Sequence, residues 1–137
     1  MIFYNSKLAK MILWNRFATV MLFGMVFTIY GKWELSETNI NHEYIHVAQW
    51  IEVTLACATL LSIVQIYFIF NPLWILFSLC AYYIIYAIFW CTAKLRGCSK
   101  RQSYHGIPFE MEAFAKEGEI GYINRRDIFA WVNYIRN

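Results

Sequence analysis

The sequence lacks charged side chains over one long stretch, since no Asp, Glu, Lys or Arg occurs between Val53 and Ala93. Charged residues make up 15% of the 137 residues and hydrophobic residues 60%, whereas globular proteins average about 25% and about 45–50%. The net charge of +3 is small, and the basic residues flank apolar segments instead of forming one stripe. This composition argues against nucleic acid as a partner and is typical of membrane proteins.

Linkers, paired cysteines and histidines are also scarce. Six glycines, two prolines and no repeat leave no candidate for a flexible linker, so we expect one domain over residues 1–137. None of the four cysteines belongs to a C-x-x-C pair, which excludes zinc ribbons and thioredoxin-like redox sites. Three histidines are too few for the histidine boxes of a membrane desaturase, and a di-iron site would need a second copy of Glu43-x-x-His46.

The uncharged stretch divides at Asn71-Pro72 into two segments of membrane length. Residues 53–70 and 73–91 supply 18 and 19 residues, close to the roughly 20 that cross about 30 Å of hydrocarbon. We therefore predict a transmembrane helical hairpin in a lipid bilayer, with a buried hairpin of a soluble protein as the alternative. Basic residues follow the second segment directly and the turn has none, so the positive-inside rule predicts an integral membrane protein with both termini in the cytoplasm.

Residues 17–30 are also apolar, but they number only 14 and are short for a membrane helix. Five of them are β-branched and Gly24 lies in the middle, which favours a strand or hairpin. A third membrane helix and a signal peptide are the alternatives. No small-x-small cleavage site follows the segment, which argues against the signal peptide.

His42, Glu43 and His46 form an H-E-x-x-H motif. Residues four apart lie on one face of a helix, so both imidazoles can reach one metal ion at about 2.0–2.1 Å. Glu43 lies beside them, in position to take a proton from an activated water and return it later. The motif predicts a Zn²⁺ site with Glu43 as general base and acid. Two interfacial histidines without a metal are the alternative.

A zinc hydrolase needs a third protein ligand, and two glutamates near the start of a predicted helix are candidates. Pro108 can begin this helix, which we expect to run to about Glu117. Glu110 and Glu112 are two residues apart and point to different faces, so only one is expected to bind the metal while the other supports an imidazole. The alternative is a pair of solvated glutamates that the helix dipole favours near the N-terminus.

Two further polar residues are candidates around this site. Gln49 lies one turn beyond His46 and can hold an imidazole or a substrate carbonyl, or else be a polar residue satisfied near the interface. His105 precedes the acidic helix and is a candidate catalytic residue that donates to a developing oxyanion.

H-E-x-x-H with a downstream helical glutamate is similar to the gluzincin arrangement of zinc metallopeptidases. The run E-M-E-A-F at residues 110–114 resembles the E-x-x-A-D helix of membrane-embedded CAAX-protease and heat-shock-protease relatives, which implies Glu110 as the third ligand and Glu112 as its support or alternative. Phe114 stands where those families carry aspartate. Nearly the whole chain also resembles small bacterial membrane proteins with N-H-E-x-I-H-x-x-Q and F-E-x-E-A motifs, which implies the bacterial cytoplasmic membrane.

These features predict a mainly α-helical membrane zinc hydrolase, specifically a peptidase that acts on peptides or membrane proteins at the cytoplasmic membrane surface. Residues 17–30 would supply an edge strand along which an extended peptide lies. The alternative is a non-catalytic metal-binding or structural membrane module that serves as a partner subunit.

The metal-binding helix is expected to continue without a break into the first apolar segment. Asn39 is the candidate N-cap, and no Gly or Pro interrupts residues 40–70, which would form a helix of roughly 45 Å. Both histidines would then lie in its first two turns, at the level of the cytoplasmic headgroups. At the C-terminus, residues 126–136 are predicted to form a short amphipathic helix.

Overall fold

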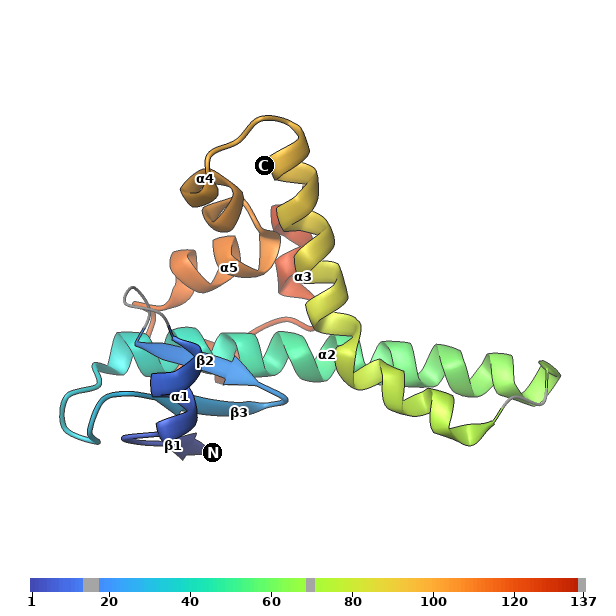
Figure 1. Ribbon diagram of the computed structural model, residues 1–137, viewed down its shortest axis with the longest axis horizontal. Coiled ribbons are helices and arrows are strands. Elements are labelled where there is room, and N and C mark those ends of the chain that lie inside the picture. Colours follow the sequence, from blue (N-terminus) through green and yellow to red (C-terminus); the bar gives the residue numbers. More distant parts are fainter. Residues whose placement is uncertain (14–17, 69–70, 136–137) are drawn as a thin grey trace.

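The computed structural model describes residues 1–13, 18–68 and 71–135, which form a mainly helical fold with one small sheet (Figure 1). In chain order the elements are β1 (Ile2–Phe3), α1 (Lys7–Ile12), β2 (Thr19–Leu22), β3 (Met25–Thr28), α2 (Glu37–Phe68), η1 (Pro72–Phe77), α3 (Ser78–Leu95), α4 (Lys100–His105), α5 (Pro108–Lys116), α6 (Tyr122–Arg125) and η2 (Ala130–Tyr134). Helix α5 begins at Pro108 as the sequence predicted.

Helix α2 runs through 32 residues without interruption, a length of about 48 Å. The predicted continuity from the H-E-x-x-H motif into the first apolar segment is therefore confirmed as far as Phe68, and residues 69–70 lie outside the described part. The predicted cap was wrong by three residues. Ser36 caps the helix, because its hydroxyl accepts from the Asn39 backbone N–H at 3.1 Å and Asn39 itself is inside the first turn.

Helix α2 is also the axis around which the other elements are arranged. Figure 1 shows the sheet and α1 on one side of its first half, and α4 and α5 on the other. One hydrophobic cluster joins α2 to β2, α3, α5 and η2, and its buried members are Met21, Val53, Tyr82, Ile107, Phe109 and Trp131. The first half of α2 is thus enclosed on several sides.

The segment 17–30 forms the predicted hairpin within the described residues, which excludes a third membrane helix there. Strands β2 and β3 pair antiparallel, and the sheet order β1-β3-β2 leaves β2 at an edge. Phe23 and Gly24 form the two-residue turn with φ of 50° and 75°, as a type I′ turn requires. A Cβ at Gly24 would lie 2.9 Å from the Trp50 ring, so only glycine fits between the turn and α2.

The second apolar segment begins as the 3₁₀ helix η1 and continues as the α-helix α3. Asn71 caps η1 by accepting from the Leu73 backbone N–H at 3.0 Å, with Pro72 at its first position. Figure 1 shows η1 alongside the far end of α2, whereas α3 turns away from α2 toward α4. The helices Glu37–Phe68 and Pro72–Leu95 are each long and apolar enough to cross a membrane, and little of either apolar window is buried in the protein.

The predicted amphipathic helix over residues 126–136 was wrong. Arg126 is extended and Phe129 has a left-handed φ of 59°, so only Ala130–Tyr134 is helical, as a 3₁₀ turn. Residue 136 lies outside the described part. The helix does not form because Arg126 is drawn inward to a buried carboxylate pair, described below.

Candidate metal centre

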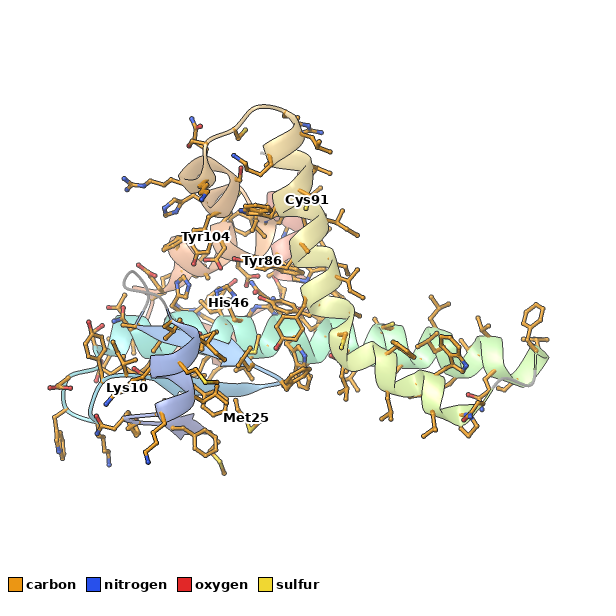
Figure 2. The ribbon with its side chains drawn as sticks, in the orientation of Figure 1. Lys10, Met25, His46, Tyr86, Cys91 and Tyr104 are labelled. Carbon is orange, nitrogen blue, oxygen red and sulfur yellow. The ribbon has the colours of Figure 1, made fainter. Side chains whose placement is uncertain are left out.

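His42 and His46 lie one turn apart near the start of α2 and direct their Nε2 atoms at each other, 3.1 Å apart. His46 is buried and the His42 side chain is 12% exposed. Figure 2 shows His46, Tyr86 and Tyr104 within the space bounded by α2, α3 and the α4–α5 region. The predicted spacing therefore brings two ring nitrogens to one point.

Acceptors on the opposite ring nitrogens determine which nitrogens carry the protons. The Glu117 carboxylate lies 2.8 Å from His42 Nδ1, and Gln49 Oε1 lies 2.8 Å from His46 Nδ1. Gln49 cannot reverse its amide, because its Nε2 donates to the Phe109 carbonyl and to Glu112 at 3.0 Å each. Both Nδ1 atoms are therefore donors, so each imidazole, when neutral, presents its Nε2 lone pair to the same point.

Glu110 completes the group from α5. Its oxygens lie 3.5 Å from His42 Nε2 and 3.4 Å from His46 Nε2. Tyr86 donates to Oε1 at 2.9 Å, while the buried Oε2 has no hydrogen-bond partner among the described residues. Burial alone would raise the pKa of Glu110, but the two imidazoles outweigh it and hold the pKa well below its usual range. The side chain is an ionised carboxylate at neutral pH.

The three side chains fit a metal ion. Their ligand atoms all lie within 4.8 Å of one another. Two imidazoles whose Nε2 atoms face each other, beside a buried carboxylate oxygen without a hydrogen-bond partner, need a positive charge between them, which a proton or a metal ion can supply. Two histidines and one glutamate are also the ligand set of hydrolytic zinc sites, which keep a fourth position open. His42, His46 and Glu110 can therefore hold a metal ion.

Glu112, the alternative ligand, points away from this group, as the two-residue spacing predicted. It is fully buried and accepts hydrogen bonds from Gln49, the Tyr122 hydroxyl and Arg126. It reaches His46 only through Gln49, so its support of the imidazole is indirect. Gln49 is thus a buried polar residue with all its hydrogen bonds made, and it is also the partner of an imidazole. The sequence suggested these as two alternative roles.

Arg126 anchors this support. Its guanidinium contacts Glu112 and also forms an ion pair with Glu52 on α2. Burial disfavours the charged guanidinium, but the two carboxylates outweigh this effect and raise the pKa of Arg126 above its usual value. A chain of hydrogen bonds therefore runs from the C-terminal segment through Glu112 and Gln49 to His46.

Glu117 is the site residue that the sequence reasoning missed. It lies seven residues after Glu110, which is two helical turns, and this spacing was the available signal. Phe114, one turn after Glu110, packs against His42 with ring centroids 4.8 Å apart. The carboxylate that holds His42 therefore comes from one turn later than the aspartate of the families that the motif resembles.

His105 stands apart from the group. It is exposed, and its ring packs on the Phe114 ring at 4.7 Å, on which His42 also packs. Tyr104, which precedes it, lines both cavities beside the site. Burial, the charge of Glu110 and a hydrogen bond to its carboxylate raise the pKa of Tyr104 well above its usual value, so its phenol keeps its proton. Tyr104 is the better placed of the two as an oxyanion donor.

Two cavities meet at Glu43, which is 7% exposed and lines both. The larger, of about 1000 Å³, extends from Glu43 and His42 to α4, where Lys100, Arg101 and His105 form part of its wall. The smaller, of about 300 Å³, lies between β2 and the tyrosines of α3 and includes all three candidate ligands. All three candidate ligands therefore border the smaller cavity, and His42 also borders the larger one.

Comparison with protein-family models, curated proteins and solved structures finds no match to this chain. The resemblance to membrane metallopeptidases therefore rests on the motif residues themselves.

Proposed function

We propose that the protein is a membrane-anchored zinc hydrolase, with zinc held by His42, His46 and Glu110. The observation that carries this proposal is the convergence of two Nε2 lone pairs and one unpartnered carboxylate oxygen, while acceptors occupy both Nδ1 atoms. Without a metal ion, a proton on one Nε2 atom would have to join the two rings, so zinc and a proton compete for the same point.

Zinc with three protein ligands supplies Lewis acidity and activates water near neutral pH. Glu43 sits beside both histidines with access to both cavities, so its carboxylate can take a proton from the attacking water and pass it to the leaving group. Tyr104, which hydrogen-bonds Glu110 in the structure, would redirect its proton to the oxygen on which negative charge develops. His42 and His46 are kept oriented by Glu117 and Gln49 throughout.

A peptide bond is the substrate that the surroundings favour. Strand β2 is an edge strand whose residues Thr19–Leu22 line the smaller cavity beside the three ligands. An extended peptide can pair with such an edge through its backbone, which would carry its scissile carbonyl past the metal. The proposed partners are therefore zinc, a peptide or membrane-protein substrate, and the lipid bilayer.

The anchor is the apolar half of α2 with η1, which the protein body leaves uncovered. Exposed large apolar side chains there include Leu60, Ile66, Phe68, Leu73 and Phe77. We place this hairpin in the bacterial cytoplasmic membrane, with both termini in the cytoplasm, on the basis of the basic residues that follow α3.

The proposal is tested with zinc-loaded protein in lipid nanodiscs and a quenched fluorogenic peptide tethered to lipid. Glu43→Gln should keep its zinc and lose about 10²- to 10⁴-fold in cleavage rate, the usual contribution of a general acid–base. Glu37→Gln, an exposed change of the same kind in the first turn of α2, serves as the control. Equal cleavage by Glu43→Gln and wild type, or none by either, would instead favour the non-catalytic metal-binding module.

A further inference from the structure

Helix α3 has two faces of different character. Its inner face meets the metal group, where Tyr86 donates to Glu110 and the Tyr82 hydroxyl lies 3.3 Å from His46 Nδ1. Its outer face carries a continuous exposed stripe without charge, formed by Leu79, Cys80, Ile84, Ala87, Ile88, Cys91 and Leu95. Within the described part of the chain, no protein element covers this stripe.

The arm that returns from the hairpin tip is too short to cross a bilayer. Six residues of 3₁₀ helix in η1 rise about 12 Å, against about 30 Å of hydrocarbon. Beyond η1 the chain does not continue along α2, because α3 turns away from it (Figure 1). The uncovered end of α2, residues 54–68, is about 22 Å long, so if α3 lies at one membrane surface, the tip at Asn71 stops short of the opposite surface.

The inner face of α3 excludes the opposite arrangement, with α3 in the middle of the bilayer. That face borders an ionised carboxylate and two imidazoles, and a charged group is costly at the centre of a bilayer. Basic residues also gather at the end of α3, where they can bind the anionic headgroups of the cytoplasmic leaflet: Lys94 lies in its last turn, and Arg96, Lys100 and Arg101 follow.

We therefore propose that the protein is monotopic. Helix α3 lies flat on the cytoplasmic leaflet with its outer stripe in lipid, and the hairpin of residues 54–77 dips into the hydrocarbon without crossing the bilayer. This replaces the two complete crossings that segment lengths alone predicted. The occupant of the stripe is the lipid monolayer, since the stripe is continuous with the apolar hairpin and ends at basic residues.

This arrangement also limits which substrates can reach the metal group, an inference that rests on the proposed hydrolase function. The metal group lies on the side of α3 away from lipid, so about one helix diameter, 10–12 Å, separates it from the membrane. Peptide bonds within the hydrocarbon cannot reach that position. The substrates would be the cytoplasmic juxtamembrane segments of membrane proteins.

The native cysteines on the stripe provide the test. Cys80 and Cys91, the latter labelled in Figure 2, are 11 residues apart, which is about 16 Å along a helix. Two variants that each retain one of them, with the other three cysteines changed to serine, are labelled with a nitroxide in liposomes containing anionic lipid. Their depths are measured by relaxation with water-soluble and lipid-soluble agents.

If α3 lies flat, both labels should lie about 5–10 Å below the headgroups, at nearly equal depth. A difference of more than about 10 Å would show that α3 crosses the bilayer, and labels that remain in water would show that it does not contact lipid. Either result overturns the proposal. These depths are independent of activity, so an inactive protein with both labels at equal shallow depth would refute the hydrolase alone.

The hairpin tip gives a second, independent readout. Asn71→Cys in a cysteine-free background should resist a membrane-impermeant maleimide applied from either side of sealed vesicles. Asp127→Cys, at an exposed position in the body, should react from one side only and serves as the control. Labelling of position 71 from the side opposite to position 127 would establish a full crossing and refute the monotopic arrangement.

Discussion

The first half of α2 buries polar side chains, whereas the second half exposes apolar ones. In the first half, three of the five buried residues are polar or charged, namely Glu43, His46 and Gln49. Beyond Val53 no described residue of the helix is buried, and large apolar side chains such as Leu60 face outward. One uninterrupted helix therefore places polar groups inside the protein and apolar groups outside it, the reverse of a water-soluble helix.

This contrast shows what stabilises each half. A buried polar group without a partner costs about 1–3 kcal/mol, so the first half depends on nearly every such group being paired. Burying a large apolar side chain contributes about 1.5–3 kcal/mol, which the second half can gain only from lipid or another protein. The first half should therefore respond to changes in pairing and the second to changes in apolarity.

The largest effect is expected from Glu110→Ala, which removes a metal ligand. Tight zinc binding should be lost, because two imidazoles alone do not complete the site. Glu112→Gln should still bind zinc, but with an affinity about 10- to 100-fold lower. This is the usual loss for a residue that orients a ligand without binding the metal, as Glu112 does for His46 through Gln49. Competition titration with a chromophoric chelator measures both. Retention of zinc by Glu110→Ala together with its loss in Glu112→Gln would reverse the assignment.

Arg126→Ala should lower the free energy of unfolding by about 3–5 kcal/mol, because it leaves the buried carboxylates of Glu112 and Glu52 unpaired. Its neighbour Arg125 forms an ion pair with Glu119 and its side chain is 64% exposed, so Arg125→Ala should cost less than about 1 kcal/mol. Urea denaturation in detergent micelles compares them. Equal losses would mean that the buried network does not stabilise the first half of α2.

In the second half of α2, Leu60→Arg should weaken membrane partitioning by about 2–3 kcal/mol, since it places a charge on the 61%-exposed apolar surface. Leu60→Met keeps the position apolar and should partition like wild type. Flotation with liposomes measures the bound fraction. Equal partitioning of the two variants would indicate that this surface contacts protein and not lipid.

The smallest effect is expected from Glu117→Gln, which weakens the acceptor that holds His42. Zinc affinity should fall about 10-fold, the lower end of the range for such residues, because the amide oxygen of Gln can still accept from Nδ1. Glu119→Gln makes the same change in charge two residues away without contacting an imidazole, and should alter affinity less than about twofold. Indistinguishable affinities would remove Glu117 from the site.

Features set by local spacing could be predicted from the sequence. The four-residue interval of His42 and His46 implied a common face, and the absence of Gly and Pro implied one continuous helix. The two-residue interval between Glu110 and Glu112 likewise implied that they point to different neighbours, as they do. The strand preference of residues 17–30 came from their β-branched composition.

Features set by contacts between distant residues could not be predicted. Glu117 reaches His42 across 75 positions, and Arg126 reaches Glu52 across 74. The second contact outweighed the apolar periodicity that suggested a helix over residues 126–136. The turn of α3 away from α2 has the same origin, because the α3 tyrosines pack against the metal group and draw the helix toward α5.

The metal content of the purified protein tests the central claim most directly. Protein prepared with equimolar zinc and passed through a desalting column should carry about one zinc per chain by inductively coupled plasma mass spectrometry. His46→Ala should carry almost none, and His105→Ala, which changes the one histidine outside the group, should match wild type. Wild-type protein without zinc, or His46→Ala with as much zinc as wild type, would contradict the proposed metal site.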